Sequence, residues 1–125
     1  MTKYKAYTKE RGIVETDYLN DIIKLTWHRV DGPAYINYIG KYIEYWIDGK
    51  IHRTNGPACI KYYDDNNKKH EIYVINGKRH RLCGPAYIEY DTNGNILQEE
   101  YYINNILYTK EQYDNELLTR KVQSL

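Results

Sequence analysis

One nine-residue pattern occurs three times in the 125-residue chain and constrains its fold more than any other feature. The pattern reads His-Arg-x-x-Gly-Pro-Ala-x-Ile, and its copies begin at His28, His52 and His80. The intervals between copies are 24 residues (52 − 28) and 28 residues (80 − 52). Because the same local sequence favours the same local structure, the pattern predicts a stack of similar units.

A second fixed point follows each copy in the same order. Tyr45–Lys50 reads Tyr-Trp-Ile-Asp-Gly-Lys, Tyr73–Lys78 reads Tyr-Val-Ile-Asn-Gly-Lys, and Tyr101–Asn105 is a shorter third copy. Asp-Gly and Asn-Gly favour two-residue hairpin turns. Only the segment between the two fixed points changes length, as the tip of a hairpin does. Each unit is therefore predicted to be a strand, a variable tip, a second strand and a tight turn.

Alternation along these strands divides their side chains between two faces of a sheet. In the first strands, one face carries Ala34, Ile36 and Tyr38, then Ala58, Ile60 and Tyr62, then Ala86, Ile88 and Tyr90. The 16 Tyr, two Trp and absence of Phe suit a thin sheet whose faces are partly wet, because tyrosine combines an apolar ring with a polar tip.

The two ends of the chain differ from the units. Two β-rich runs flank Asn20-Asp21 and predict a degenerate N-terminal hairpin over 13–27, with a short helix across 17–25 as the alternative. At the other end, Thr109 and Gln112 match a capping box that begins a helix over about 110–122. This helix is expected to cover the last open edge of the sheet. Its predicted apolar side consists of Tyr113, Leu117, Leu118 and Val122.

The sequence therefore predicts an all-β fold. We expect an antiparallel meander of stacked β-hairpin repeats, forming a single twisted sheet of about eight strands, with a short C-terminal capping helix. The whole chain, 1–125, is expected to be one domain, with three repeats over 28–108 and the capping helix within 109–125.

The Tyr-x-Asn-Gly-Lys-x-His units resemble MORN-type repeats over 28–108. The variant with His-Arg-x-x-Gly-Pro-Ala is similar to repeat proteins of large DNA viruses and bacteriophages. It departs from the usual MORN pattern in two ways: Arg29, Arg53 and Arg81 follow the histidines, and Gly-Pro-Ala replaces the usual glycine spacing. The resemblance implies a scaffold or interaction module without catalytic residues, and it implies a viral source.

Composition excludes several classes of function. Lys and Arg number 18 against 17 Asp and Glu, so a general attraction to nucleic acid or to a membrane is not expected. No apolar run approaches the ~20 residues of a membrane span, and the first residues lack the apolar core of a signal peptide. Cys59 and Cys83 lie in different contexts and are expected to be reduced thiols. These features favour the cytoplasm, of the host cell if the protein is viral.

The His-Arg pairs are the first candidate site. If successive copies lie two or three strands apart, they are separated by roughly 10–14 Å, so the histidines cannot share a metal ion whose bonds are about 2 Å long. The spacing suits a row of cations that meets phosphates or an acidic protein surface. The alternative is that these side chains bond the carbonyls and carboxylates of neighbouring turns. The candidates are His28, His52, His80, Arg29, Arg53, Arg81, Lys50, Lys78 and Arg79.

The second candidate site is an aromatic face opposite the Ala-Ile-Tyr stripe. A flat aromatic face flanked by Lys and Arg could stack bases or bury a protein partner. Equally, the N-terminal segment and the C-terminal helix could cover it. Its residues are Tyr35, Trp46, Tyr87 and Tyr102.

Motifs of enzymes are absent from the sequence, including a nucleophile elbow, a P-loop and a Cys-x-x-Cys pair. We therefore expect no enzyme activity, no cofactor and no metal. The leading hypothesis is an interaction or scaffold protein, of viral origin, that binds a host or viral macromolecule, with a protein as the first candidate. The alternative is an anion- or nucleotide-binding inhibitor of a nucleic-acid-binding host-defence enzyme. An open sheet surface would also suit a homodimer.

Overall fold

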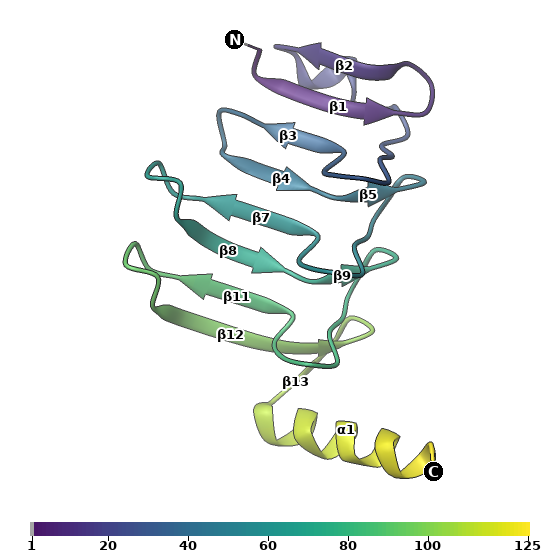
Figure 1. Cartoon of the computed structure of the whole chain (residues 1–125), viewed down its shortest axis with the longest axis vertical. Helices are drawn as coiled ribbons and strands as arrows, with labels where there is room; N and C mark the ends of the chain where they lie inside the picture. The colour runs from purple at the N-terminus through teal and green to yellow at the C-terminus, as the bar shows by residue number, and fades with distance from the viewer. Residues whose placement is uncertain (1) are drawn as a thin grey trace.

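The computed structural model describes residues 2–125 and contains one antiparallel sheet of nine strands, followed by a helix (Figure 1). The predicted fold class is confirmed, with nine strands in the main sheet instead of about eight. Their order across the sheet is β13 (Ile106–Tyr108), β12 (Ile96–Ile103), β11 (Tyr87–Tyr90), β8 (Lys68–Ile72), β7 (Cys59–Tyr62), β4 (Tyr42–Glu44), β3 (Tyr35–Asn37), β1 (Tyr4–Thr8) and β2 (Gly12–Thr16).

Short hairpins end the first two units beside the main sheet. They pair β5 (Trp46–Ile47) with β6 (Lys50–Ile51), and β9 (Val74–Ile75) with β10 (Lys78–Arg79). In their turns, φ is +50° and +76° at Asp48 and Gly49, and +49° and +78° at Asn76 and Gly77. Positive φ at both central residues defines the type of two-residue turn whose twist matches that of the flanking strands. Asp, Asn and Gly tolerate positive φ best. The predicted turns are therefore present.

The repeated alanines join each unit to the one before it. Ala34, Ala58 and Ala86 are 0% exposed. Each alanine N–H donates to the second strand of its own unit, over 2.8 to 2.9 Å, and each alanine carbonyl accepts from a tyrosine N–H of the preceding unit at 2.7 Å. These tyrosines are Tyr7, Tyr45 and Tyr73. Strand β1 therefore serves as the second strand of an incomplete leading unit.

The hairpin predicted over 13–27 is wrong. Strand β2 pairs with β1 at the edge of the sheet, and the chain then forms a 3-10 helix, η1 (Leu19–Asp21), and crosses one sheet face. Ile22 is fully buried there, and the Trp27 ring stacks on Tyr35 with centroids 4.5 Å apart. The apolar residues of this segment therefore cover the sheet instead of extending it, and with Ala6 and Val14 they form the main core.

The predicted capping box begins α1 (Lys110–Gln123), because Thr109 and Gln112 exchange side chain–backbone hydrogen bonds. Tyr113 is buried against the end of the stack. Leu118 and Val122, however, are 60% and 58% exposed, so the predicted four-residue buried side is wrong for these two. At 100° per residue they lie opposite Tyr113 on the helix.

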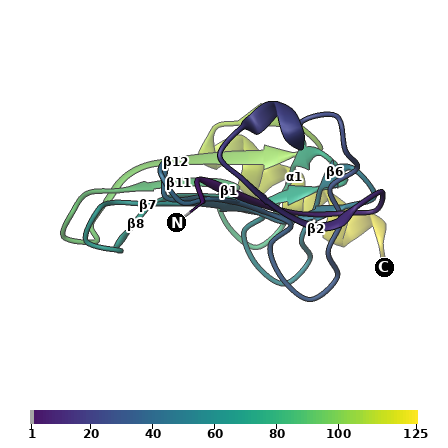
Figure 2. The ribbon, with the colours of Figure 1, turned by 90° about the horizontal axis from the view of Figure 1, so that it is seen from above.

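The two faces of the sheet differ. Viewed from above, η1 lies on one side of the sheet, and loops between the strands project from the other (Figure 2). We call these loops the GP loops: loop 1 is 28–34, loop 2 is 52–58 and loop 3 is 80–86. The side that carries them is the loop face, and the side that η1 partly covers is the aromatic face.

Candidate binding face

Each repeated histidine holds the tight turn of the following hairpin. The backbone N–H of Asp48 donates to His28 Nδ1, that of Asn76 to His52 Nδ1, and that of Asn104 to His80 Nδ1, each at 3.0 Å. An imidazole that accepts at Nδ1 is neutral and carries its proton on Nε2. The histidines are therefore structural links between successive units.

The repeated arginines bond within their own loops. In loop 2, Arg53 Nε donates to Asn55 Oδ1 and Nη1 donates to the Pro57 carbonyl, both at 3.1 Å. The guanidinium also lies 3.9 Å from the centroid of the Tyr45 ring. In loop 1, Arg29 makes the same contacts with Asp31, Pro33 and Tyr7.

Loop 3 lacks one of these contacts. Arg81 Nη1 donates to the Pro85 carbonyl, and the guanidinium lies 3.8 Å from the Tyr73 centroid. Among residues 2–125 its buried Nε has no hydrogen-bond partner, because Cys83 stands where the other loops have Asp31 and Asn55.

The glycine of each GP loop makes room for the guanidinium. A Cβ at Gly32 would lie 2.7 Å from Arg29 Cζ, and a Cβ at Gly56 would lie 2.9 Å from Arg53 Cζ. Neither glycine has a positive φ. Close packing of the arginine, and not backbone freedom, therefore accounts for these two glycines.

The predicted cations do not form one row. Lys50 and Lys78 are exposed, and each follows the tight turn of its own short hairpin. Arg79 lies instead with the aromatic face, 5.9 Å from the Tyr87 centroid and 5.3 Å from the Tyr102 centroid. On the loop face, the predicted row of cations therefore includes the arginines and histidines of the GP loops. It does not include Arg79.

Two equivalent grooves separate successive GP loops. Groove 1, between loops 1 and 2, has a volume of about 470 Å³. Groove 2, between loops 2 and 3, has a volume of about 440 Å³. Groove 1 is lined by Arg29, Val30, Asp31, Gly32, Tyr45, Ile47, His52, Arg53, Thr54 and Asn55. Groove 2 is lined by Arg53, Thr54, Asn55, Gly56, Tyr73, Ile75, His80, Arg81, Leu82 and Cys83.

The predicted aromatic face is largely covered in its N-terminal half. Tyr35 is 3% exposed under Trp27, so its prediction as an exposed contact residue is wrong. Trp46 packs edge-on against Trp27 with centroids 5.0 Å apart, and its Nε1–H donates to Glu44. Tyr87 and Tyr102 are only half-buried and lie beside Arg79. The covering segment 17–27 accounts for the difference between the two halves.

Burial shifts the pKa values of two neighbouring groups in this region, Cys59 and Glu44. Burial raises the pKa of the Cys59 thiol to about 12, with a further contribution from the nearby Glu44 carboxylate. Burial also raises the pKa of Glu44. Among residues 2–125, no three His, Cys, Asp or Glu side chains gather closely enough to hold a metal ion.

Comparison with protein-family models, curated proteins and solved structures found no match for this chain. None of the helices formed by residues 2–125 has the length and apolarity needed to span a membrane.

Two contributors to the loop face were not among the predicted site residues. The rings of Tyr45 and Tyr73 lie against the guanidinium groups of Arg53 and Arg81, and both tyrosines line the grooves. Their regular recurrence eight residues before Arg53 and Arg81 was the available signal (53 − 45 and 81 − 73).

Proposed function

We propose that the protein is a non-enzymatic interaction protein that binds a segment of another protein along its loop face. The observation that carries this proposal is the pair of equivalent grooves between the GP loops. Each groove is lined by an isoleucine, Ile47 or Ile75, together with polar side chains. Their volumes fall within the range of about 300–1,000 Å³ that is typical of ligand sites.

The repeat architecture supports a macromolecular partner. Equivalent grooves side by side suit a ligand that spans both, because binding at the second groove then becomes intramolecular. The resemblance to MORN-type scaffolds supports the same class of function. The resemblance to viral repeat proteins supports a viral origin. A second copy of the chain is one candidate for the protein partner.

The guanidinium groups favour one alternative, the capture of an anion or nucleotide. Each GP-loop arginine uses Nη1 within its loop, and the guanidinium has five N–H donors in all. Arg29 and Arg53 both line groove 1. In this alternative the protein would inhibit a nucleic-acid-binding enzyme of host defence.

A peptide-display selection on the folded protein tests the proposal. Thr54 lines both grooves, so Thr54→Trp is designed to block them together. Thr92→Trp, in an exposed hairpin tip, is the matched control. We expect the selected peptides to bind Thr54→Trp at least about tenfold more weakly, and to bind Thr92→Trp like wild type.

The salt dependence separates the two candidates. A protein segment held by ring and backbone contacts should bind almost equally at 50 and 500 mM salt, whereas an anion held by arginine should bind far more weakly at high salt. Peptides that bind Thr54→Trp as tightly as wild type would contradict the loop face as the binding site.

A further inference from the structure

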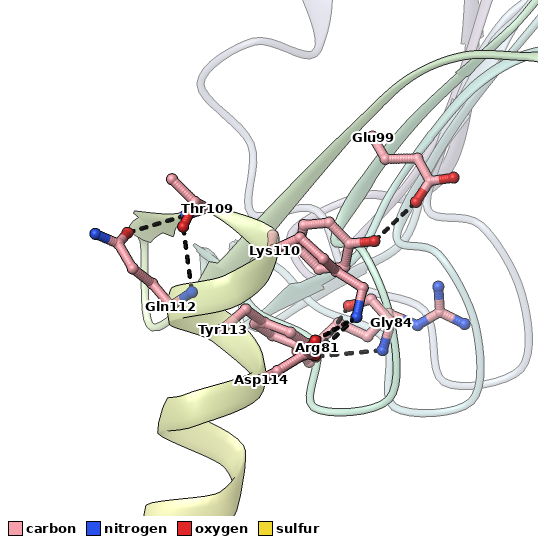
Figure 3. Close-up of polar contacts among 9 residues, drawn as sticks. Arg81, Gly84, Glu99, Thr109, Lys110, Gln112, Tyr113 and Asp114 are labelled. Atoms are coloured by element: carbon pink, nitrogen blue, oxygen red, sulfur yellow. Dashed lines mark hydrogen bonds and ion pairs between the residues drawn. The ribbon is translucent and has the colours of Figure 1, made fainter.

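The protein itself fills the position that follows loop 3. The ring of Tyr113, from α1, packs against Tyr101 with centroids 4.8 Å apart. Its hydroxyl lies 2.6 Å from the Arg81 carbonyl and 3.0 Å from the Gly84 carbonyl, and it accepts from the Gly84 N–H at 3.2 Å (Figure 3). The hydroxyl of Tyr113 therefore bonds the backbone of loop 3 while its ring packs, tilted, against Tyr101.

The three residues that hold Tyr113 have counterparts in both grooves. Arg81, Gly84 and Tyr101 occupy the repeat positions of Arg29, Gly32 and Tyr45, and of Arg53, Gly56 and Tyr73. All six counterparts line the grooves. There the rings of Tyr45 and Tyr73 already lie against the guanidinium groups of Arg53 and Arg81, whereas Tyr101 has Tyr113 in that place. Within residues 2–125, no group hydrogen-bonds to the carbonyls of Arg29 and Arg53 or to the N–H of Gly32 and Gly56. The grooves thus present the backbone groups that a phenol hydroxyl bonds in loop 3.

We propose that grooves 1 and 2 each receive a tyrosine side chain of a partner, whose hydroxyl bonds the loop backbone as the Tyr113 hydroxyl does and whose ring packs against the guanidinium of Arg53 or Arg81. This inference rests on the proposed function and names the partner's chemistry. The hydroxyl both donates to a loop carbonyl and accepts from a glycine N–H, which a phenylalanine ring cannot do. Losing these bonds should weaken binding by about tenfold per groove.

The spacing of the grooves selects the conformation of the partner. Equivalent positions in successive units lie two strands apart, which is about 9.6 Å. A polyproline II segment rises about 3.1 Å per residue with three residues per turn, so residues i and i+3 lie on one side about 9.3 Å apart. Residues three apart on a β-strand point to opposite sides. Of these two extended conformations, the polyproline II segment fits the grooves, with the pattern Tyr-x-x-Tyr.

The first test uses 4-methylphenol as a minimal tyrosine side chain, with methoxybenzene as a control ring that lacks the O–H. Both are titrated into the ¹⁵N-labelled full chain. We expect 4-methylphenol to shift the amide resonances of Gly32 and Gly56 more than methoxybenzene does, and to leave Gly84 unchanged. Equal effects of the two compounds, or no shift at Gly32 and Gly56, would overturn the proposal.

The second test compares three proline-rich peptides, with tyrosines three apart, phenylalanines three apart, and tyrosines four apart. We expect the first to bind at least tenfold more tightly than either of the others, and to lose this advantage on Thr54→Trp but not on Thr92→Trp. Equal affinity of the tyrosine and phenylalanine peptides would overturn the inference. If peptides chosen by selection still require Thr54 but contain no tyrosine, the proposed function stands and only this inference fails.

Discussion

Arg53 is held on three sides: by the Asn55 amide oxygen, by the Pro57 carbonyl and by the ring of Tyr45. A planar guanidinium can satisfy all three contacts at once, whereas the ammonium of a lysine cannot. Gly56 allows this group to approach the loop backbone. Three fixed residues of the motif, Arg53, Gly56 and Pro57, are therefore explained by contacts with one another.

The coupling between the glycine and the arginine is testable. We expect Gly56→Ala to lower the free energy of unfolding by about 1–3 kcal/mol, because the new Cβ displaces the guanidinium. In an Arg53→Ala background the same change should cost much less. Urea unfolding of the four proteins measures this coupling. An equal cost in both backgrounds would show that the glycine serves another purpose.

Loop 3 can be improved by restoring the missing acceptor. Cys83→Asn should give Arg81 Nε the partner that Asn55 gives Arg53 Nε. We expect a gain of about 1 kcal/mol, seen as a rise in Tm of roughly 3–5 °C. The reciprocal change, Asn55→Cys, should lower the Tm by a similar amount. Unchanged melting in both variants would rule out this role for the side-chain oxygen.

His80 should make stability depend on pH. Burial, and then the charge of Arg120, lower the pKa of His80 below its ordinary value. Between the lowered pKa and about 6.5, the unfolded chain binds more protons than the folded chain. The free energy of unfolding should therefore not depend on His80 above about pH 6.5, and it should decrease as the pH falls below that value.

The control for this prediction is His80→Asn. Burial also lowers the pKa of His70, which acts in the same direction, so wild type and variant must be compared. Urea unfolding at pH 7.5 and 5.5 should show a smaller decrease for His80→Asn than for wild type. The same decrease in both would exclude His80 as a source.

At the scale of elements, the end of the stack depends on a single helix. Helix α1 contacts β12 and β13, and Tyr113 is its only fully buried residue among those described. Its outer side chains, Leu118 and Val122, do not stabilise the sheet contact because they face solvent. One tyrosine therefore connects most of α1 to the units.

We expect Tyr113→Phe to lower the free energy of unfolding by about 1–3 kcal/mol, because the Gly84 N–H and the loop 3 carbonyls lose a partner. Tyr18→Phe is the control, since the Tyr18 side chain is exposed. Thermal unfolding followed by circular dichroism measures both. Similar Tm values for the two variants would contradict the role given to the hydroxyl.

The elements that the sequence predicted well are those specified by neighbouring residues. The tight turn at Asn76-Gly77 and the capping box at Thr109 each depend on a few adjacent positions. The segment 17–27 could not be predicted in this way, because apolar residues such as Ile22 and Trp27 suit a strand and a covering segment equally. Only the pairing of β2 with β1 decides between the two.

The candidate site shows the same limit. The repetition of Arg and His indicated the GP loops, but it could not distinguish a binding row from structural contacts. Arg79 looked like a member of the cationic row, yet it belongs to the aromatic face. The contact of Tyr113 with Arg81 joins residues 32 positions apart and has no local signature.

At the scale of the whole molecule, the units interact mainly with their neighbours, and the N- and C-termini lie at opposite ends of the stack (Figure 1). In such a chain the stability is approximately a sum of unit terms and interface terms. The repeats lie between β2 at one end and α1 at the other, and neither of these elements belongs to a repeat.

A longer stack should therefore fold. We expect a protein with a second copy of residues 52–79 inserted between Arg79 and His80 to keep its β-sheet circular dichroism and to melt at or above the wild-type Tm. An insertion of the same length made of glycine and serine at the same place is the control, and it should lower the Tm. If the repeat insertion destabilises the protein as much as the control does, the units are not interchangeable.

The order of strands along the stack also determines how the molecule responds to force. Because the strands lie across the line that joins the termini (Figure 1), a pull on the two ends acts along the inter-strand hydrogen bonds. These bonds then carry the load in series and separate one strand pair at a time. The protein should consequently extend by unzipping at low tension, one unit after another, and should resist a pull along its hairpins far better.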